Sequence, residues 1–240
     1  SLGSRGLGDV YKRQDFKNQN IDDFLENLDI DKTVEISSIQ GGYSNALKQL
    51  NKFIEVGYQD YAKYRSDPSK EASSQLSPYF HSGQISTHEV FDKISELESW
   101  SPESINPKMV GRREGWWGST ENFESFMDEL ITWRELGYHT CVRRANYNQY
   151  SSLPEWAIKT LHEHSSDERE HIYSLDELTY SQTHDEIWNA AQNQLRTQGV
   201  IQNYLRMLWG KKILEWTPNP QIALSYICLL YTSDAADDSR

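Results

Sequence analysis

One glutamate, Glu129, stands among large apolar side chains, a setting in which a carboxyl group can do chemistry. Its neighbours include Phe126, Leu130 and Trp133, and positions i and i+4 share one face of a helix. A carboxyl group beside an apolar pocket has a raised pKa and can donate or accept a hydrogen bond. A glutamate at the edge of an exposed helix face explains the same pattern equally well.

Three tryptophans, Trp188, Trp209 and Trp216, follow one another at intervals of 21 and 7 residues. Trp209 and Trp216 are two helical turns apart and therefore lie on one face of one helix. Indole rings that converge could relay electrons to a redox cofactor. Such a stripe is more often part of a buried core, and the pattern alone favours core.

A serine-rich segment, SSQLSPYFHSGQIS at residues 73–86, precedes one of the predicted helices. Serine hydroxyls and backbone N–H groups ahead of a helix can hold a phosphate group. Composition alone favours a plain turn over a phosphate site.

Histidines gather in LHEHSSDEREH, residues 161–171. No two of them stand at i and i+4, and a third dedicated ligand is missing, so we expect no metal site.

Helices must position these residues, because apolar side chains recur at helical spacing and no sustained alternation occurs. The helical ranges are Ala46–Tyr64, Ile85–Leu97, Phe123–Gly137, His184–Leu195 and Ile201–Trp216. Thr87 is the expected N-cap of the second range, and Ser174 with Glu177 forms a capping box before a further helix. Residues 99–122 are expected to form a structured insertion. We therefore predict an all-α fold.

The chain has 240 residues, with 36 acidic against 24 basic side chains and a formal net charge of −12. Phosphate contacts need lysine and arginine, so the average composition does not suggest a nucleic-acid binder, although it does not exclude a local basic face. No apolar run reaches membrane-spanning length. Away from the two ends Cys141 is the lone cysteine, which fits a reducing compartment and a cytoplasmic location.

Both ends of the chain look foreign to the sequence between them. DVYKRQ, residues 9–14, translates the DNA GATGTGTATAAGAGACAG, and CLLYTS, residues 228–233, translates its reverse complement. We interpret both as a sequencing adaptor read as coding sequence, which leaves an internal fragment of a longer gene between them. The expected division is an adaptor-derived segment 1–14, a linker region 15–40, a helical domain 41–227 and an adaptor-derived segment 228–240.

Five linked motifs resemble the FAD-binding helical domain of class II cyclobutane pyrimidine dimer photolyases, within the photolyase/cryptochrome family. They are YAKYRSDP followed by SSQLSPYFHSGQIS, FMDELITWREL, PEWAIKTLHEHSSDERE, THDEIWNAAQ and YLRMLWGKKILEW. The resemblance runs from about Gly41 to Ile227. It implies an all-α catalytic domain that binds FAD and that is truncated at its C-terminal end.

The resemblance also implies roles for individual residues. FAD would be bound by Tyr61, Ser73, Ser74, Gln75, Leu76, Ser77 and Arg206, with the serine-rich run at its phosphates. DNA would be contacted by Arg65 and Asn203. Electrons would be relayed by Trp188, Trp209 and Trp216, which reverses the preference for core alone. Glu129 would hydrogen-bond the carbonyl groups of the dimer, and Trp133 would stack on the flipped lesion.

The implied activity is that of a deoxyribodipyrimidine photo-lyase acting on ultraviolet-damaged DNA. Light-excited reduced FAD would pass one electron to the cyclobutane dimer and regain it after the ring splits. A cryptochrome-like photoreceptor without repair is the alternative, and repair of the (6-4) lesion is a minor one. Glu129 and Trp133 favour cyclobutane repair. We expect a monomer.

Three positions depart from the family pattern: His139 replaces the usual Asn, Gln202 the usual His and Asn203 the usual Gly. These three residues change the local flavin or DNA contacts that the family pattern implies. The family's Asn facing flavin N5 is expected about four residues after Ile227, where this sequence has Tyr231. We therefore expect the chain as written to repair poorly or not at all.

Overall fold

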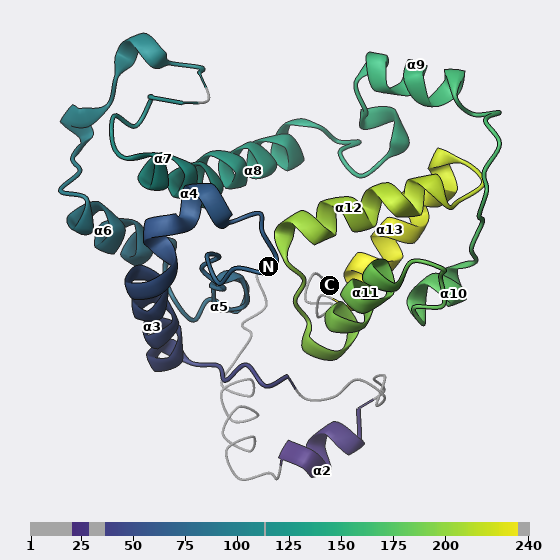
Figure 1. Cartoon of the computed structure of the whole chain (residues 1–240), viewed down its shortest axis with the longest axis horizontal. Helices are drawn as coiled ribbons and strands as arrows, with labels where there is room; N and C mark the ends of the chain where they lie inside the picture. Colours follow the sequence, from purple (N-terminus) through teal and green to yellow (C-terminus); the bar gives the residue numbers. More distant parts are fainter. Residues whose placement is uncertain (1–20, 29–36, 113, 235–240) are drawn as a thin grey trace, which may run out of the picture. The chain divides into compact units, whose positions relative to one another are not determined.

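The computed structural model describes residues 21–28, 37–112 and 114–234. Every regular element in these ranges is helical, which confirms the predicted all-α fold. Contacts divide the chain into residues 1–36, which contribute the short helix α2 (Ile21–Glu26), and residues 37–240, which hold every predicted site residue (Figure 1). Within the described ranges no helix is long and apolar enough to cross a membrane.

The first half of the larger unit contains six α-helices joined by tighter and wider helical turns. They are α3 (Tyr43–Lys52), α4 (Tyr61–Tyr64), α5 (Ser77–His81), α6 (Thr87–Leu97), α7 (Glu121–Met127) and α8 (Arg134–Arg143). Short 3₁₀ turns lie at Tyr58–Asp60, Pro102–Ser104 and Pro107–Met109.

Two helices that were predicted to be continuous α-helices are interrupted at their centres, so these two predictions were wrong. π-Helical turns occupy Phe53–Gly57, between α3 and α4, and Asp128–Trp133, between α7 and α8. A π-helical turn hydrogen-bonds from i to i+5 and shifts the register, yet the apolar spacing on either side stays helical. Such turns are frequent at functional sites, and Glu129 lies in the second one.

An aromatic cluster fixes α4 against α7. The ring of Phe53 lies 5.2 Å from that of Phe126 and 5.6 Å from that of Tyr61, and Tyr61 is 5.3 Å from Phe126. All three side chains are buried. Burying a large apolar side chain contributes about 1.5–3 kcal/mol, so this packing sets where Arg65 and Glu129 lie.

The predicted insertion between α6 and α7 is structured. The carboxylate of Glu124 accepts hydrogen bonds from the backbone N–H groups of Gly115 and Gly118. The indole of Trp100 donates to the carbonyl of Trp117 at 2.7 Å. These contacts anchor the insertion to α7.

The N-cap of helix α6 lies one residue before the position expected for it. Ser86 is the N-cap, and its hydroxyl accepts a hydrogen bond from the N–H of His88 at 3.1 Å. Ser86 has extended backbone angles, whereas Thr87 is already helical and its hydroxyl accepts from Arg134. The prediction of Thr87 as the cap was therefore wrong.

The second half of the larger unit contains five helices. They are α9 (Glu155–Glu163), α10 (Leu175–Thr179), α11 (Glu186–Gln198), α12 (Asn203–Glu215) and α13 (Pro220–Asp234), with a 3₁₀ turn at Tyr150–Ser152 before α9. The predicted capping box of Ser174 and Glu177 is present at α10. Helix α11 ends at Gly199 in the left-handed conformation that glycine adopts easily. Helix α13 runs past Ile227, and the boundary predicted there stays a prediction.

Candidate functional site

Glu129 and Arg65 form a partly buried ion pair. The Nη1 atom of Arg65 lies 2.5 Å from Oε1 of Glu129, and the two side chains are 25% and 34% exposed. Arg65 directly follows α4, while Glu129 lies on the π-helical turn after α7. Partial burial makes such a pair stronger than a fully solvated one, and it fixes the direction of the Glu129 carboxyl group. The structure therefore places the predicted DNA contact Arg65 against the predicted catalytic carboxyl group.

Tyr61 lies next to this ion pair and is almost completely buried. The guanidinium carbon of Arg65 is 5.9 Å from the centre of the Tyr61 ring. Burial raises the pKa of Tyr61 to about 12, and the nearby positive charge of Arg65 offsets this only in part. The phenol is therefore neutral at physiological pH.

The raised pKa of Tyr61 predicts a loss of stability in alkali. The unfolded chain ionises its tyrosines near pH 10, whereas folded Tyr61 stays protonated to about pH 12, so its contribution is present below pH 10 and is lost as the pH rises to 12. We expect this contribution to the free energy of unfolding to be about 2 kcal/mol. Denaturant titrations at pH 9 and pH 12 should show that Tyr61→Phe loses less stability than the parent chain. Equal losses in the two proteins would contradict the assignment.

The first turn of α12 also contacts Arg65. The side-chain Nε2 of Gln202, which caps α12, donates to the backbone carbonyl of Arg65 at 2.8 Å. The predicted DNA contact Asn203 and the predicted FAD contact Arg206 lie in the following turn, where Arg206 donates to Asn203 at 2.8 Å. Gln202 thus joins α12 to the ion pair, a role that the sequence did not indicate.

Trp133 remains open to solvent, with 58% of its surface exposed. It ends the π-helical turn that carries Glu129, and α8 starts at the next residue. An exposed indole can stack on a flat apolar partner such as a nucleobase. The structure therefore leaves Trp133 free for the stacking that the resemblance implies.

The three tryptophans converge in the second core of the unit. The ring of Trp188 lies 6.3 Å from that of Trp209, with the planes 2° apart, and 5.6 Å from that of Trp216, with the planes 69° apart. Each ring is at most 4% exposed. Trp188 is thus the middle member of a path through Trp209, Trp188 and Trp216. The rings serve as core, and the same contacts suit a relay.

Gln192 is a buried partner of this path that sequence reasoning missed. Its side-chain oxygen accepts a hydrogen bond from the indole N–H of Trp209 at 2.7 Å, and its exposure is 0%. The indole of Trp188 donates instead to the carbonyl of Trp209 at 3.2 Å. A glutamine four residues after Trp188 lies on the same helix face, which is the signal that could have revealed it.

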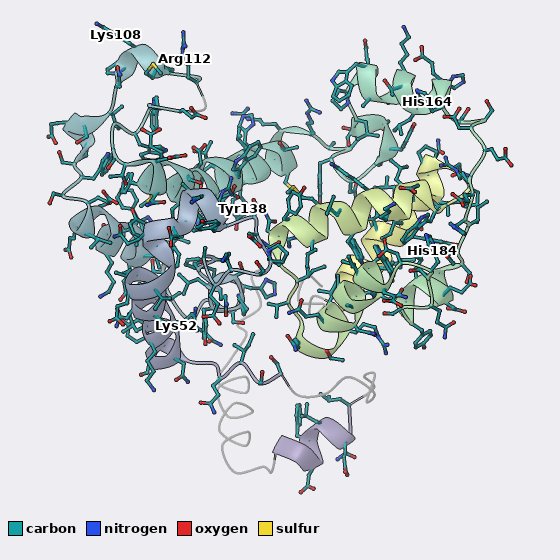
Figure 2. All side chains as sticks on the ribbon, viewed as in Figure 1. Lys52, Lys108, Arg112, Tyr138, His164 and His184 are labelled. Atoms are coloured by element: carbon teal, nitrogen blue, oxygen red, sulfur yellow. The ribbon has the colours of Figure 1, made fainter. Side chains whose placement is uncertain are left out.

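Trp216 also contacts two polar aromatic residues, Tyr173 and His184. The rings of Tyr173 and His184 lie 5.5 and 5.3 Å from its ring. The hydroxyl of Tyr173 is hydrogen-bonded to Nδ1 of His184 at 2.7 Å, and His184 is exposed (Figure 2). One end of the tryptophan path therefore approaches the solvent.

The serine-rich loop before α5 is held in place by a buried side chain and a hydrogen bond. The side chain of Leu76 is completely buried, and the carbonyl of Ser74 accepts from Nε2 of Gln49 at 2.9 Å. Gln75 has a left-handed backbone, with φ of 55°. Burial leaves only the backbone of Leu76 available to a cofactor.

The side chains around this loop include donor types that bind phosphate. A small pocket is lined by both Ser73 and Gln75 of the loop and by Lys52 of α3. The Lys52 ammonium lies 3.3 Å from Glu71, an exposed carboxylate from which it can turn away. Hydroxyl groups and an ammonium group are the donors that phosphate oxygens prefer. Of the predicted FAD contacts only Ser73 and Gln75 line this pocket. The others do not: Tyr61, Ser74, Leu76, Ser77 and Arg206.

The sequence is similar to proteins named deoxyribodipyrimidine photo-lyase. No family model matches the sequence. A deoxyribodipyrimidine photo-lyase from Methanothermobacter thermautotrophicus is 37% identical over 213 residues, which is 89% of this chain and 42% of the relative. One from Potorous tridactylus is 35% identical over 204 residues, which is 85% of this chain and 35% of the relative. The chain thus spans less than half the length of these curated relatives.

A solved structure supports the fold. The class III photolyase from Agrobacterium tumefaciens matches with a TM-score of 0.53 at 18% identity, over 89% of this chain and 43% of that one. The described helices therefore form an all-α domain of the photolyase type. The sequence relatives and this shared fold together support the photolyase/cryptochrome family for this chain.

Proposed function

We propose that the chain is part of a class II cyclobutane pyrimidine dimer photolyase, which repairs ultraviolet-damaged DNA with light. The observation that carries the proposal is the buried ring-to-ring path through Trp209, Trp188 and Trp216. Relatives named deoxyribodipyrimidine photo-lyase support the activity. The class rests on the five linked motifs in their observed order.

Bound reduced FAD would supply the light-driven electron donor for this reaction. The hydroxyl groups of Ser73, Ser74 and Ser77 would hold its phosphates, together with the ammonium group of Lys52. Gln75 and the backbone of Leu76 would shape the loop around them. Tyr61 and Arg206 complete the proposed set of contacts.

Glu129 would hydrogen-bond the carbonyl groups of a flipped dimer. Arg65 orients this carboxyl group through the ion pair, and Gln202 fixes the backbone of Arg65. The exposed indole of Trp133 would stack on the lesion. Because a dimer stacks poorly in the duplex, flipping it out costs less than flipping a normal base.

The proposal is tested with the whole chain loaded with FAD, reduced and mixed with a duplex that contains one cyclobutane dimer. Blue light should restore the two pyrimidines only slowly, because Tyr231 stands where the family's Asn facing flavin N5 is expected, and a dark sample should leave the dimer intact. Both outcomes are measured by chromatography. Bound flavin without repair would instead indicate a cryptochrome-like photoreceptor. Repair of a (6-4) duplex alone would contradict the proposed substrate.

A further inference from the structure

The end of α8 and the loop after it form a local exception to the acidic charge of the chain. From Leu136 to Pro154 the sequence contains no aspartate or glutamate, although the chain carries 36 acidic residues in 240. The same stretch contains Arg143 and Arg144, at the last turn of α8 and just after it. A net charge of −12 therefore conceals a short basic segment.

The side chains of this segment are exposed and its arginines lack acidic partners. No residue of α8 is buried, and Tyr138 and Val142 are 64% and 81% exposed. Tyr138 is labelled in Figure 2. Among the described residues, neither Arg143 nor Arg144 is in an ion pair. One N–H of Arg144 donates to the carbonyl of Ser152 at 3.1 Å, which closes the loop and leaves its other donors available.

We propose that this α8-end surface, residues 138–152, contacts the phosphate backbone of duplex DNA beside the flipped dimer, with Arg143 and Arg144 as the phosphate ligands. The choice of DNA as partner rests on the proposed function. The positive charge, in a stretch of sequence that contains no carboxylate, matches a polyanion, and the loop adds tyrosine, asparagine and serine groups that commonly bind phosphate.

The helix geometry places these arginines at a useful distance from Trp133. Trp133 directly precedes α8 and Arg144 directly follows it, so the length of this helix separates the two residues. At the rise of an α-helix the separation along the axis is about 16 Å. Successive base pairs rise by about 3.4 Å, so a duplex lying along α8 would have its contacted phosphates roughly five base pairs from the stacked lesion.

The ion pair of Arg65 also favours phosphate contacts at the end of α8. Its guanidinium group is held by Glu129, so phosphate contacts need cations elsewhere in this acidic chain. An arginine in the last turn of a helix also stabilises the helix dipole, which accounts for Arg143. This stabilisation of the helix does not account for the absence of carboxylates over the whole loop. It also does not account for the exposed Tyr138 and Tyr147.

The test measures by fluorescence anisotropy how the affinity of the whole chain for duplex DNA depends on salt. The duplex is used once with a cyclobutane dimer and once undamaged. In Arg143→Gln/Arg144→Gln we expect both affinities to fall, and the slope of log K against log salt to become shallower by about 1.8, from about 0.9 for each phosphate contact. Lys108→Gln/Arg112→Gln is the matched control, since it removes the same charge from the insertion between α6 and α7. Its slope should equal that of the parent chain.

Three results would overturn the inference: no salt-dependent binding of duplex by the parent chain, an unchanged slope in the double variant, or an equal change in the control. Stronger binding to anionic lipid vesicles than to duplex would also overturn it. The proposed function is judged separately by repair. A chain that binds duplex through these arginines but leaves dimers intact contradicts the function and leaves the inference standing.

Discussion

Replacing Trp188 by phenylalanine is expected to abolish light-driven reduction of flavin bound to this chain. The ring of Trp188 contacts both Trp209 and Trp216, so the path depends on its middle member. Phenylalanine keeps most of the buried apolar surface but is much harder to oxidise than an indole. The measurement is the change in flavin absorbance under blue light with an external reductant present.

The control for this experiment is Trp117→Phe, which removes a buried indole from the first core. Both variants lose packing, and Trp188→Phe also loses a hydrogen bond to Trp209 worth about 1 kcal/mol. Thermal unfolding shows whether each variant is folded. If Trp188→Phe is folded and its flavin is reduced by light at the parent rate, the relay is wrong and the three rings are core alone.

Replacing Glu129 by alanine is expected to slow repair of a cyclobutane dimer by roughly a hundredfold, the effect typical of removing one preorganised hydrogen-bonding group from an active site. The change removes the proposed partner of the dimer carbonyl groups. It also releases the partly buried guanidinium of Arg65 from its ion pair. Repair is measured per absorbed photon at saturating duplex, so that weaker binding does not enter.

Two further variants separate chemistry from structure. Glu129→Gln keeps an oxygen that can accept from Arg65, and it should retain more repair than alanine if orientation of the side chain matters. Glu135→Gln changes an exposed glutamate on the neighbouring helix, and its repair should match the parent chain. Equal repair by Glu129→Ala and the parent would remove Glu129 from the proposed site.

Helical spacing predicted the fold class well, because each amphipathic helix carries its own pattern of apolar residues. The capping box at Ser174 could also be predicted, since its two side chains stand three residues apart. The π-helical turns at Phe53–Gly57 and Asp128–Trp133 could not. They change the register of a helix without breaking its apolar pattern, and packing between helices decides whether they form.

The sequence by itself determined that the fold is helical, that Trp209 and Trp216 share a helix face, and that Glu129 stands among apolar side chains. Only the tertiary structure decided that Trp188 lies in the middle of the path, that Gln192 holds Trp209, and that Arg65 pairs with Glu129. The physical reason is the range of the interactions. Spacing along one helix fixes which side chains share its face, whereas contacts between residues 64 positions apart depend on how separate helices pack together.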